Sequence, residues 1–359
     1  MTSEKRLLDN KAFFQRQDPQ RMLDLLVEFP AQCEHAWALG NAFPLPRISS
    51  FRDILFLGMG GSAIGGDLAK SLLEEEVHCP IVVNRSYSLP AFVNKESIVF
   101  AVSYSGNTEE TLAAYQAARR KKATLVVVAS GGKLIEYAKE DGIPHLLIPT
   151  GLPPRTAMGY LFFVPYILLR KLRGLSLRHG EFREMVKGLE FLREKKIGPE
   201  VPFSRNLSKQ IALRLVGKIP AIHGGVPRME AVAMRWRTQI AENAKQLSWS
   251  HLYPELNHNE IVGWCEPKNL LRHLLILLLR DSGDHPRVKK RMDITQSLLR
   301  RESGVETLEV WSSGHSALER VLSLIYTGDF VSFYLAMFNH VDPTPVKRIE
   351  RLKKQLAHR

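Results

Sequence analysis

Short apolar runs alternate with amphipathic stretches along the first half of this chain. Runs of strand length fall at 54–57, 81–83, 97–102, 124–129 and 145–148. Helical periodicity follows the first of these runs at 64–76 and the third at 109–122. Strands that alternate with helices of this length are typical of a parallel sheet covered by helices.

The same alternation restarts after a helical and polar stretch at about 156–200. Strands are predicted at 219–223, 273–279 and 306–311, and helices at 229–243, 286–302 and 316–338. The run at 273–279 is almost purely apolar, which is typical of a strand buried on both faces. A last amphipathic helix follows Pro343, with Asp342 or Thr344 as its cap.

The pattern therefore predicts an α/β protein with two doubly wound domains, each a parallel sheet flanked by helices. We place a helical lead-in at 1–45, a first domain at 46–180 and a second domain at 181–359. A chain of 359 residues fits this division, because single cores rarely grow beyond about 250–300 residues.

The net charge of +13 raises the possibility of nucleic-acid binding. The excess cations lie in short groups such as 119–122, 289–291 and 353–354, within helical stretches where a solvated face is expected. Neither an aromatic RNA-binding motif nor a zinc-finger spacing accompanies them. We therefore expect no nucleic-acid partner, and instead an attraction for anionic metabolites.

The three cysteines, Cys33, Cys79 and Cys265, are far apart in the sequence and form no Cys-x-x-Cys pair. This spacing disfavours a zinc site or a disulfide framework and is typical of a reducing cytoplasm. The N-terminal residues lack the apolar core of a signal peptide. The longest apolar runs, 161–169 and 274–279, are much shorter than the ~20 residues that cross a bilayer. We expect a soluble cytoplasmic protein without a metal or a membrane partner.

A glycine-rich turn at 58–63, Gly-Met-Gly-Gly-Ser-Ala, joins the first predicted strand to its helix. It satisfies the G-x-G-x-x-A pattern of dinucleotide-binding turns, in which glycines let backbone N–H groups approach a phosphate. The next strand ends in Asn84 and Arg85 rather than in the acid that binds the ribose of NAD. Arg85 could serve NADP, so a dinucleotide site remains an alternative.

Three hydroxyl side chains, those of Ser103, Ser105 and Thr108, lie within six residues at the start of the next helix. Hydroxyls at a helix N-terminus can donate hydrogen bonds to phosphate oxygens. The alternative is that Asn107 or Thr108 caps the helix. One cap needs only one hydroxyl and leaves two unexplained, so we favour phosphate binding.

This strand-Ser-x-Ser-Gly-x-Thr-x-Glu-Thr-helix pattern resembles the SIS (sugar isomerase) domain. Six blocks in order resemble motifs of the bifunctional phosphoglucose/phosphomannose isomerase family: GMGGSAIGGD (58–67), SYSGNTEET (103–111), PPRTAMG (153–159), AENAK (241–245), PELNHNEIVGW (254–264) and DPTPV (342–346). The resemblance runs from about residue 45 to the end of the chain.

The resemblance implies an aldose–ketose isomerase that interconverts glucose 6-phosphate and fructose 6-phosphate, and also mannose 6-phosphate, through a cis-enediolate. It implies no cofactor. The residues that it assigns to the sugar phosphate come from the glycine-rich turn and the hydroxyl cluster: Gly61, Ser62, Ser103, Ser105 and Thr108.

Three further roles follow from matching the motifs. Glu242 would be the base that moves a proton between C1 and C2, Arg155 would bind substrate and stabilise the enediolate, and His258 would open the sugar ring. In related isomerases this histidine reaches into a neighbouring subunit's site, so the resemblance implies a homodimer with shared sites. Tyr334 aligns with a catalytic lysine of archaeal members, which leaves its own role open.

Two other functions remain open on the sequence alone. A phosphosugar sensor would retain the hydroxyl cluster and would not need Glu242. An NADP-dependent oxidoreductase would use the glycine-rich turn at 58–63 for its dinucleotide.

Overall fold

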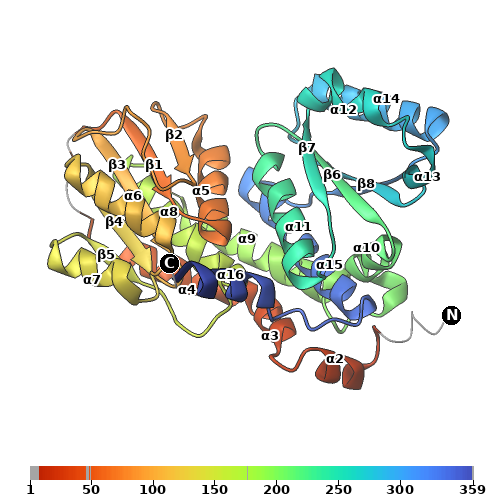
Figure 1. The fold of residues 1–359 in the computed structure, drawn as a ribbon, viewed down its shortest axis with the longest axis horizontal. Coiled ribbons are helices and arrows are strands. Elements are labelled where there is room, and N and C mark those ends of the chain that lie inside the picture. The colour runs from red at the N-terminus through yellow and green to blue at the C-terminus, as the bar shows by residue number, and fades with distance from the viewer. Residues whose placement is uncertain (1–7, 46–47, 49, 176, 358–359) are drawn as a thin grey trace.

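The computed structural model describes residues 8–45, 48, 50–175 and 177–357. Figure 1 shows two lobes side by side, each built around its own parallel sheet. This arrangement confirms the predicted α/β fold.

The first sheet has the strand order β2-β1-β3-β4-β5, and all of its pairs are parallel. Its strands are β1 (Asp53–Leu57), β2 (Ile81–Asn84), β3 (Ser97–Ser103), β4 (Thr124–Ala129) and β5 (His145–Leu147). Helix α5 (Gly60–Leu73) covers one face, and α6 (Glu109–Arg120) and α7 (Gly132–Glu140) cover the other. The strand order reverses between β1 and β3, which is where open α/β sheets bind ligands.

The second sheet repeats this topology with the order β7-β6-β8-β9. Its strands are β6 (Ile219–Gly225), β7 (Trp249–Tyr253), β8 (Leu274–Arg280) and β9 (Glu306–Trp311). The helices of this lobe are α10 (Leu207–Leu215), α11 (Met229–Asn243), α12 (Glu260–Gly263), α13 (Lys268–Leu271) and α14 (Pro286–Glu302). Here the strand order reverses between β6 and β8.

Two long apolar helices lie in the core. Helix α8 (Met158–Leu172) packs against α4 (Phe29–Ala42) and α5. Helix α15 (Ala317–Phe338) packs against α9 (His179–Leu192), α10 and α11. By length and composition alone α15 could cross a membrane, but its apolar stretch is wholly buried inside the fold. It is therefore the core helix of the second lobe.

The remaining helices lie near the two ends of the chain and between the lobes. They are α2 (Lys11–Gln17), α3 (Met22–Val27), α4 (Phe29–Ala42), α9 (His179–Leu192) and α16 (Lys347–Ala357). The first three lie within 1–45, where a helical lead-in was expected, and residues 1–7 of that stretch lie outside the described residues. The domain boundary at residue 180 stays a prediction.

Most predicted elements are confirmed to within two residues, but helices α7, α10, α12 and α13 were not predicted, and three further differences follow. Helix α5, predicted from residue 64, begins at Gly60, which adopts φ +51° and turns the chain directly into the helix. Strand β7 was not predicted, because it is an edge strand in which Tyr253 alone is fully buried. The stretch at 156–200 is not polar throughout, since it contains the buried helix α8.

The contact between α5 and α8 depends on Gly65, because a Cβ there would clash with the Leu161 carbonyl. We expect Gly65→Ala to lower the free energy of unfolding by about 1–3 kcal/mol, as overpacking usually does. Gly188→Ala in α9 is the matched control: its Cβ would meet only the Glu319 carboxylate, 3.7 Å away, and alanine favours the helix. The measurement is the midpoint of thermal unfolding. An equal decrease of the midpoint in both variants would contradict this account.

Candidate functional site

The loops that follow β1 and β3 meet at the point where the first strand order reverses. A Cβ on Gly58 would lie only 3.1 Å from the Val102 carbonyl oxygen, so the loop after β1 lies against the end of β3. Helix α5 starts there without a side-chain cap, and Ser62 is buried in its first turn. The N-terminus of α5 therefore faces the second loop with backbone N–H groups that no side chain caps.

The hydroxyl cluster lies in that second loop. Ser103 Oγ is 2.9 Å from Thr108 Oγ1 and accepts a hydrogen bond from Gly106 N at 3.2 Å. Ser105 is exposed, and its Oγ accepts from Asn107 N.

The capping alternative does not account for this cluster. Thr108 occupies the N-cap position of α6, but its side chain makes no capping hydrogen bond. The Asn107 side chain accepts instead from Lys133 N at the start of α7, at 3.0 Å. The cluster therefore lies at a second helix N-terminus that no side chain caps.

Arg155 lies next to these loops, in the short 3-10 helix η1 (Pro154–Thr156). The segment before Arg155 is linked to the hydroxyl loop by Tyr104. The Tyr104 hydroxyl donates to Pro149 O at 3.0 Å and accepts from Leu152 N at 2.7 Å. A Cβ on Gly61 would lie 3.9 Å from Arg155 Cα. The structure thus brings the glycine-rich turn, the hydroxyl cluster and Arg155 together.

The Arg155 guanidinium is held in one orientation. Nε donates to Asn243 Oδ1 at 2.6 Å, and Nη2 donates to the carbonyls of Pro343 and Thr344, both at 2.7 Å. Nη1 faces Glu242 Oε2 at 3.6 Å. That separation exceeds a hydrogen bond, so Glu242 does not use the hydrogen-bonding capacity of Nη1.

A buried hydrogen-bond network of Asp329 and Arg235 holds the backbone carbonyl of Arg155. Asp329 of α15 pairs with Arg235 of α11 through two bonds, of 3.0 and 2.7 Å. Arg235 Nη2 in turn donates to the Arg155 carbonyl at 3.0 Å. Removal of one partner from such a pair leaves an uncompensated buried charge, which costs about 3–5 kcal/mol.

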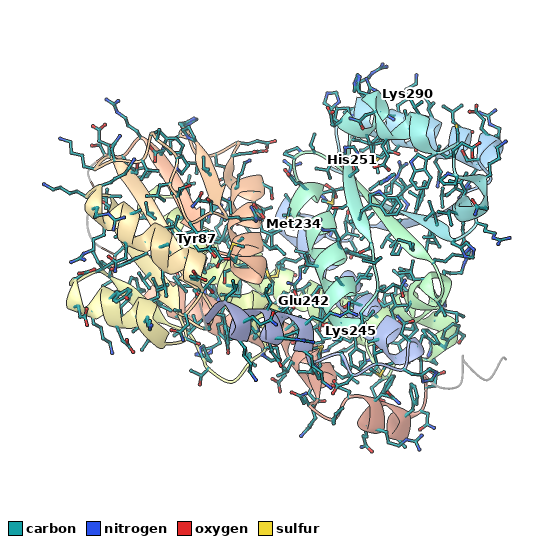
Figure 2. The ribbon with its side chains drawn as sticks, in the orientation of Figure 1. Tyr87, Met234, Glu242, Lys245, His251 and Lys290 are labelled. Carbon is teal, nitrogen blue, oxygen red and sulfur yellow. The ribbon has the colours of Figure 1, made fainter. Side chains whose placement is uncertain are left out.

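Glu242 and Lys245 lie at the C-terminal end of α11, side by side in Figure 2. The Glu242 side chain is 31% exposed, whereas that of Arg155 is 6% exposed. The Lys245 ammonium donates to the Glu242 carbonyl and, at 3.1 Å, to that of Pro343. Burial, and then repulsion from Arg155, lower the pKa of Lys245 to about 8.

The loop after β8 in the second lobe corresponds to the loop after β3 in the first. It carries acids instead of hydroxyls. After β8, the buried Asp281 accepts from Arg320 Nε at 2.7 Å and from Ser312 Oγ at 2.6 Å. The carboxylate of Asp284 accepts from Asp281 N, and burial raises the pKa of Asp284 to about 6. Two carboxyl groups there disfavour an anion, so the first lobe is the better phosphate site.

His258 does not join Glu242 in the same chain. It is exposed in the 3-10 helix η4 (Glu255–His258), which follows β7 at the carboxyl edge of the second sheet. Helix α11 runs back from that edge, and Glu242 lies at its far end, roughly 20 Å away for a helix of this length. Figure 1 shows α12, which directly follows this segment, at the end of the second lobe opposite to the C-terminal end of α11.

The carboxylate of Glu260 anchors the segment that carries His258. It lies 2.8 Å from both His223 Nε2 and His251 Nδ1, and Trp264 Nε1 donates to it at 3.2 Å. Burial alone would raise the pKa of Glu260, but the two histidines lower it to about 2. The segment is therefore fixed to β6 and β7.

Two residues from the sequence analysis lie outside the site. Tyr334 is fully buried and donates to the Ile197 carbonyl at 2.9 Å, so it cannot replace a substrate-facing lysine. Arg85 pairs with Asp67 and contacts Met234 of the second lobe, so its charge is already engaged. Among the described residues, no three His, Cys, Asp or Glu side chains are grouped as metal ligands.

Sequence reasoning missed four contributors: Asn243, Lys245 and the carbonyls of Pro343 and Thr344. Each lies inside a motif already singled out, AENAK or DPTPV. The motifs that contain these residues could therefore be seen in the sequence. That the two motifs meet around Arg155 could not, because it depends on packing between the lobes.

The positive charge of Arg155 helps to lower the pKa of Lys245, and this effect can be tested. We expect Arg155→Met to move the pKa of Lys245 from about 8 toward the ordinary lysine value, because it removes a repelling cation. A ¹³C NMR titration of the lysine side chains measures this, with Lys245→Met to assign the signal. An unchanged pKa would show that Arg155 does not act on this amine.

Comparisons with known proteins bear on the fold and the family. A family model described as a SIS domain matches residues 47–141, and one described as the bacterial phosphoglucose isomerase C-terminal SIS domain matches 204–356. A solved structure, of a hypothetical protein from Thermus thermophilus, superposes with a TM-score of 0.76 at 17% identity, covering 99% of this chain and 93% of that one. It shares the fold.

Two curated relatives are bifunctional phosphoglucose/phosphomannose isomerases. That of Caldicellulosiruptor bescii is 43% identical over 94% of this chain and 99% of its own length. That of Aquifex aeolicus is 37% identical over 86% of this chain and 92% of its own. With this identity over nearly the whole length of both proteins, the chain belongs to the bifunctional phosphoglucose/phosphomannose isomerase family.

Proposed function

We propose that this protein interconverts glucose 6-phosphate and fructose 6-phosphate, and also mannose 6-phosphate, through a cis-enediolate. The observation that carries the proposal is the pairing of a fixed, buried guanidinium with a partly exposed carboxylate, Arg155 and Glu242, beside the first-lobe loops. The names of relatives at 37–43% identity support both activities. The free cysteines are consistent with work in a reducing cytoplasm.

The sugar phosphate binds where the first strand order reverses. The amide of Gly61 and the hydroxyls of Ser62, Ser103, Ser105 and Thr108 would hold its oxygens. The uncapped starts of α5 and α6 support this placement, because both helix N-termini favour a dianion.

Glu242 removes the proton from C2 of the open-chain aldose and returns it to C1, while a proton passes from O2 to O1. The intermediate is an enediolate, whose negative oxygen would meet the Nη1 edge of Arg155. Because the guanidinium is already fixed by Asn243 and two carbonyls, it need not reorganise as the charge develops.

His258 opens the sugar ring in the site of a second subunit, and the working unit is a homodimer. Two observations support this arrangement: His258 is exposed, and it lies at the opposite end of α11 from Glu242. An imidazole titrates in the range that ring opening requires.

The test of the central proposal is Glu242→Gln, which keeps the side-chain volume and removes the base. We expect turnover of fructose 6-phosphate to fall by about 10²–10⁴-fold, with binding of this sugar phosphate changed only slightly by calorimetry. Glu184→Gln, on the exposed face of α9, is the control and keeps full activity. Wild-type activity is measured with and without a chelator.

Other outcomes identify the competing functions. Full activity in Glu242→Gln would remove this residue from the mechanism. A wild-type protein that binds fructose 6-phosphate without turning it over would be a sensor, and tight binding of NADPH would favour the oxidoreductase.

Mixed dimers test the shared site. Glu242→Gln and His258→Ala subunits are each expected to lose activity, yet a mixed dimer has one site with both residues intact. Random exchange makes about half of the dimers mixed, so about a quarter of wild-type turnover should return. If mixing restores nothing, His258 does not act across subunits.

A further inference from the structure

The proposed isomerisation moves two protons, and the residues assigned so far carry only one of them. Glu242 carries hydrogen between C2 and C1, while a second proton must pass from O2 to O1 in the same turnover. The Arg155 guanidinium stabilises charge but does not release its proton. His258 lies at the opposite end of α11, and the buried Tyr334 hydroxyl already donates to the Ile197 carbonyl. The second transfer therefore calls for another titratable group beside Glu242.

Lys245 is a titratable side chain in that place. It comes three residues after Glu242, and the two side chains lie side by side in Figure 2. Its ammonium donates to the carbonyls of Glu242 and Pro343, and the Pro343 carbonyl also accepts from Arg155 Nη2. The two cations thus share one acceptor oxygen, which places the Lys245 amine beside both Arg155 and Glu242. These bonds use two of its three N–H groups, and the third can meet a substrate oxygen.

The backbone at Lys245 is not one that a lysine prefers. Lys245 follows the end of α11 with φ +56°, in the left-handed region. Glycine is the usual residue just after a helix in this conformation, because it has no Cβ to strain the backbone. Unfavourable backbone conformations of this kind cluster at functional sites. The strain at this position is consistent with a side chain that is kept for its chemistry.

Charged groups from three parts of the fold face the Lys245 amine: Arg155 of η1, Glu242 of α11 and Asp342 of the C-terminal segment. Burial and then repulsion from Arg155 lower the pKa of Lys245 to about 8, and the two acids oppose this decrease only in part. An amine with this pKa both releases and regains a proton near neutral pH, whereas an ordinary lysine keeps its proton.

We propose that Lys245 is a further catalytic residue, which carries the proton between O2 and O1 while Glu242 carries the one between C2 and C1. The inference rests on the proposed function. As Glu242 takes the C2 proton of the aldose, the ammonium gives a proton to O1 and neutralises the enediolate to an enediol. The amine then takes the O2 proton as Glu242 returns its proton to C1. This step makes the C2 ketone and restores both the ammonium and the carboxylate.

The first test compares Lys245→Arg with Lys245→Met. Arginine keeps the charge and the donors for the two carbonyls but does not release its proton. We expect both variants to convert fructose 6-phosphate about 10²-fold more slowly than the wild type. Lys187→Met, which changes an exposed lysine of α9, is the control and keeps full activity. A wild-type rate in Lys245→Arg would overturn the proposal, because charge and hydrogen bonds alone would then suffice.

A second measurement distinguishes lost proton transfer from a misplaced Glu242. In D₂O, Glu242 exchanges a C1 proton of fructose 6-phosphate whenever the enediolate forms and returns, whether or not conversion follows. We expect the ratio of exchange to conversion, measured by ¹H NMR, to rise by about tenfold or more in Lys245→Arg. An equal loss of exchange and conversion would show that Lys245 only supports the position of Glu242, and would overturn the proposal.

The pH profile provides a third readout. The ammonium is the proton donor in either direction, so kcat/KM of the wild type should fall as the pH rises through about 8. This decrease should be absent from Lys245→Met. The same decrease in both proteins would assign it to another group and contradict the proposal.

Failure of this inference is distinguishable from failure of the proposed function. Unchanged conversion in the Lys245 variants, beside an inactive Glu242→Gln, would remove the proton carrier and keep the isomerase. A wild-type protein that neither converts fructose 6-phosphate nor exchanges its C1 proton would remove both.

Discussion

The site depends on how the guanidinium of Arg155 is held. This side chain comes from the first lobe, yet its hydrogen bonds go to Asn243 of the second lobe and to the carbonyls of Pro343 and Thr344. Its own carbonyl accepts from Arg235, which Asp329 of the core helix α15 holds. One buried cation thereby links both lobes and the C-terminal segment, and with them Glu242 to the loops that follow β1 and β3.

The two lobes share a topology but carry different side chains where their strand orders reverse. Both sheets reverse their strand order beside their first strand. At that point the first lobe has hydroxyls and two uncapped helix starts, whereas the second has Asp281 and Asp284. Of these two positions, the one in the first lobe is therefore the more favourable for an anion, and the second lobe contributes the carboxylate of Glu242 from the far end of α11.

Most of the fold and part of the candidate site could be predicted from the sequence. Apolar strands such as β3 and β8, buried on both faces, were predicted because their pattern needs no tertiary context. Strand β7 was not, because an edge strand keeps polar side chains. The motifs named Glu242 and Arg155, but the bond from Arg155 to Asn243 joins residues 88 positions apart and depends on the packing of the lobes. The burial of Tyr334 likewise follows from the packing of α15, which motif matching does not reveal.

The most direct test is a crystal structure with a linear five-carbon phosphate that mimics the enediolate. The account predicts phosphate oxygens within hydrogen-bond distance of Ser103 and Thr108, and the mimic's oxygens between Arg155 Nη1 and Glu242. A phosphate bound elsewhere, with the hydroxyl cluster unoccupied or the mimic turned away from Glu242, would contradict it.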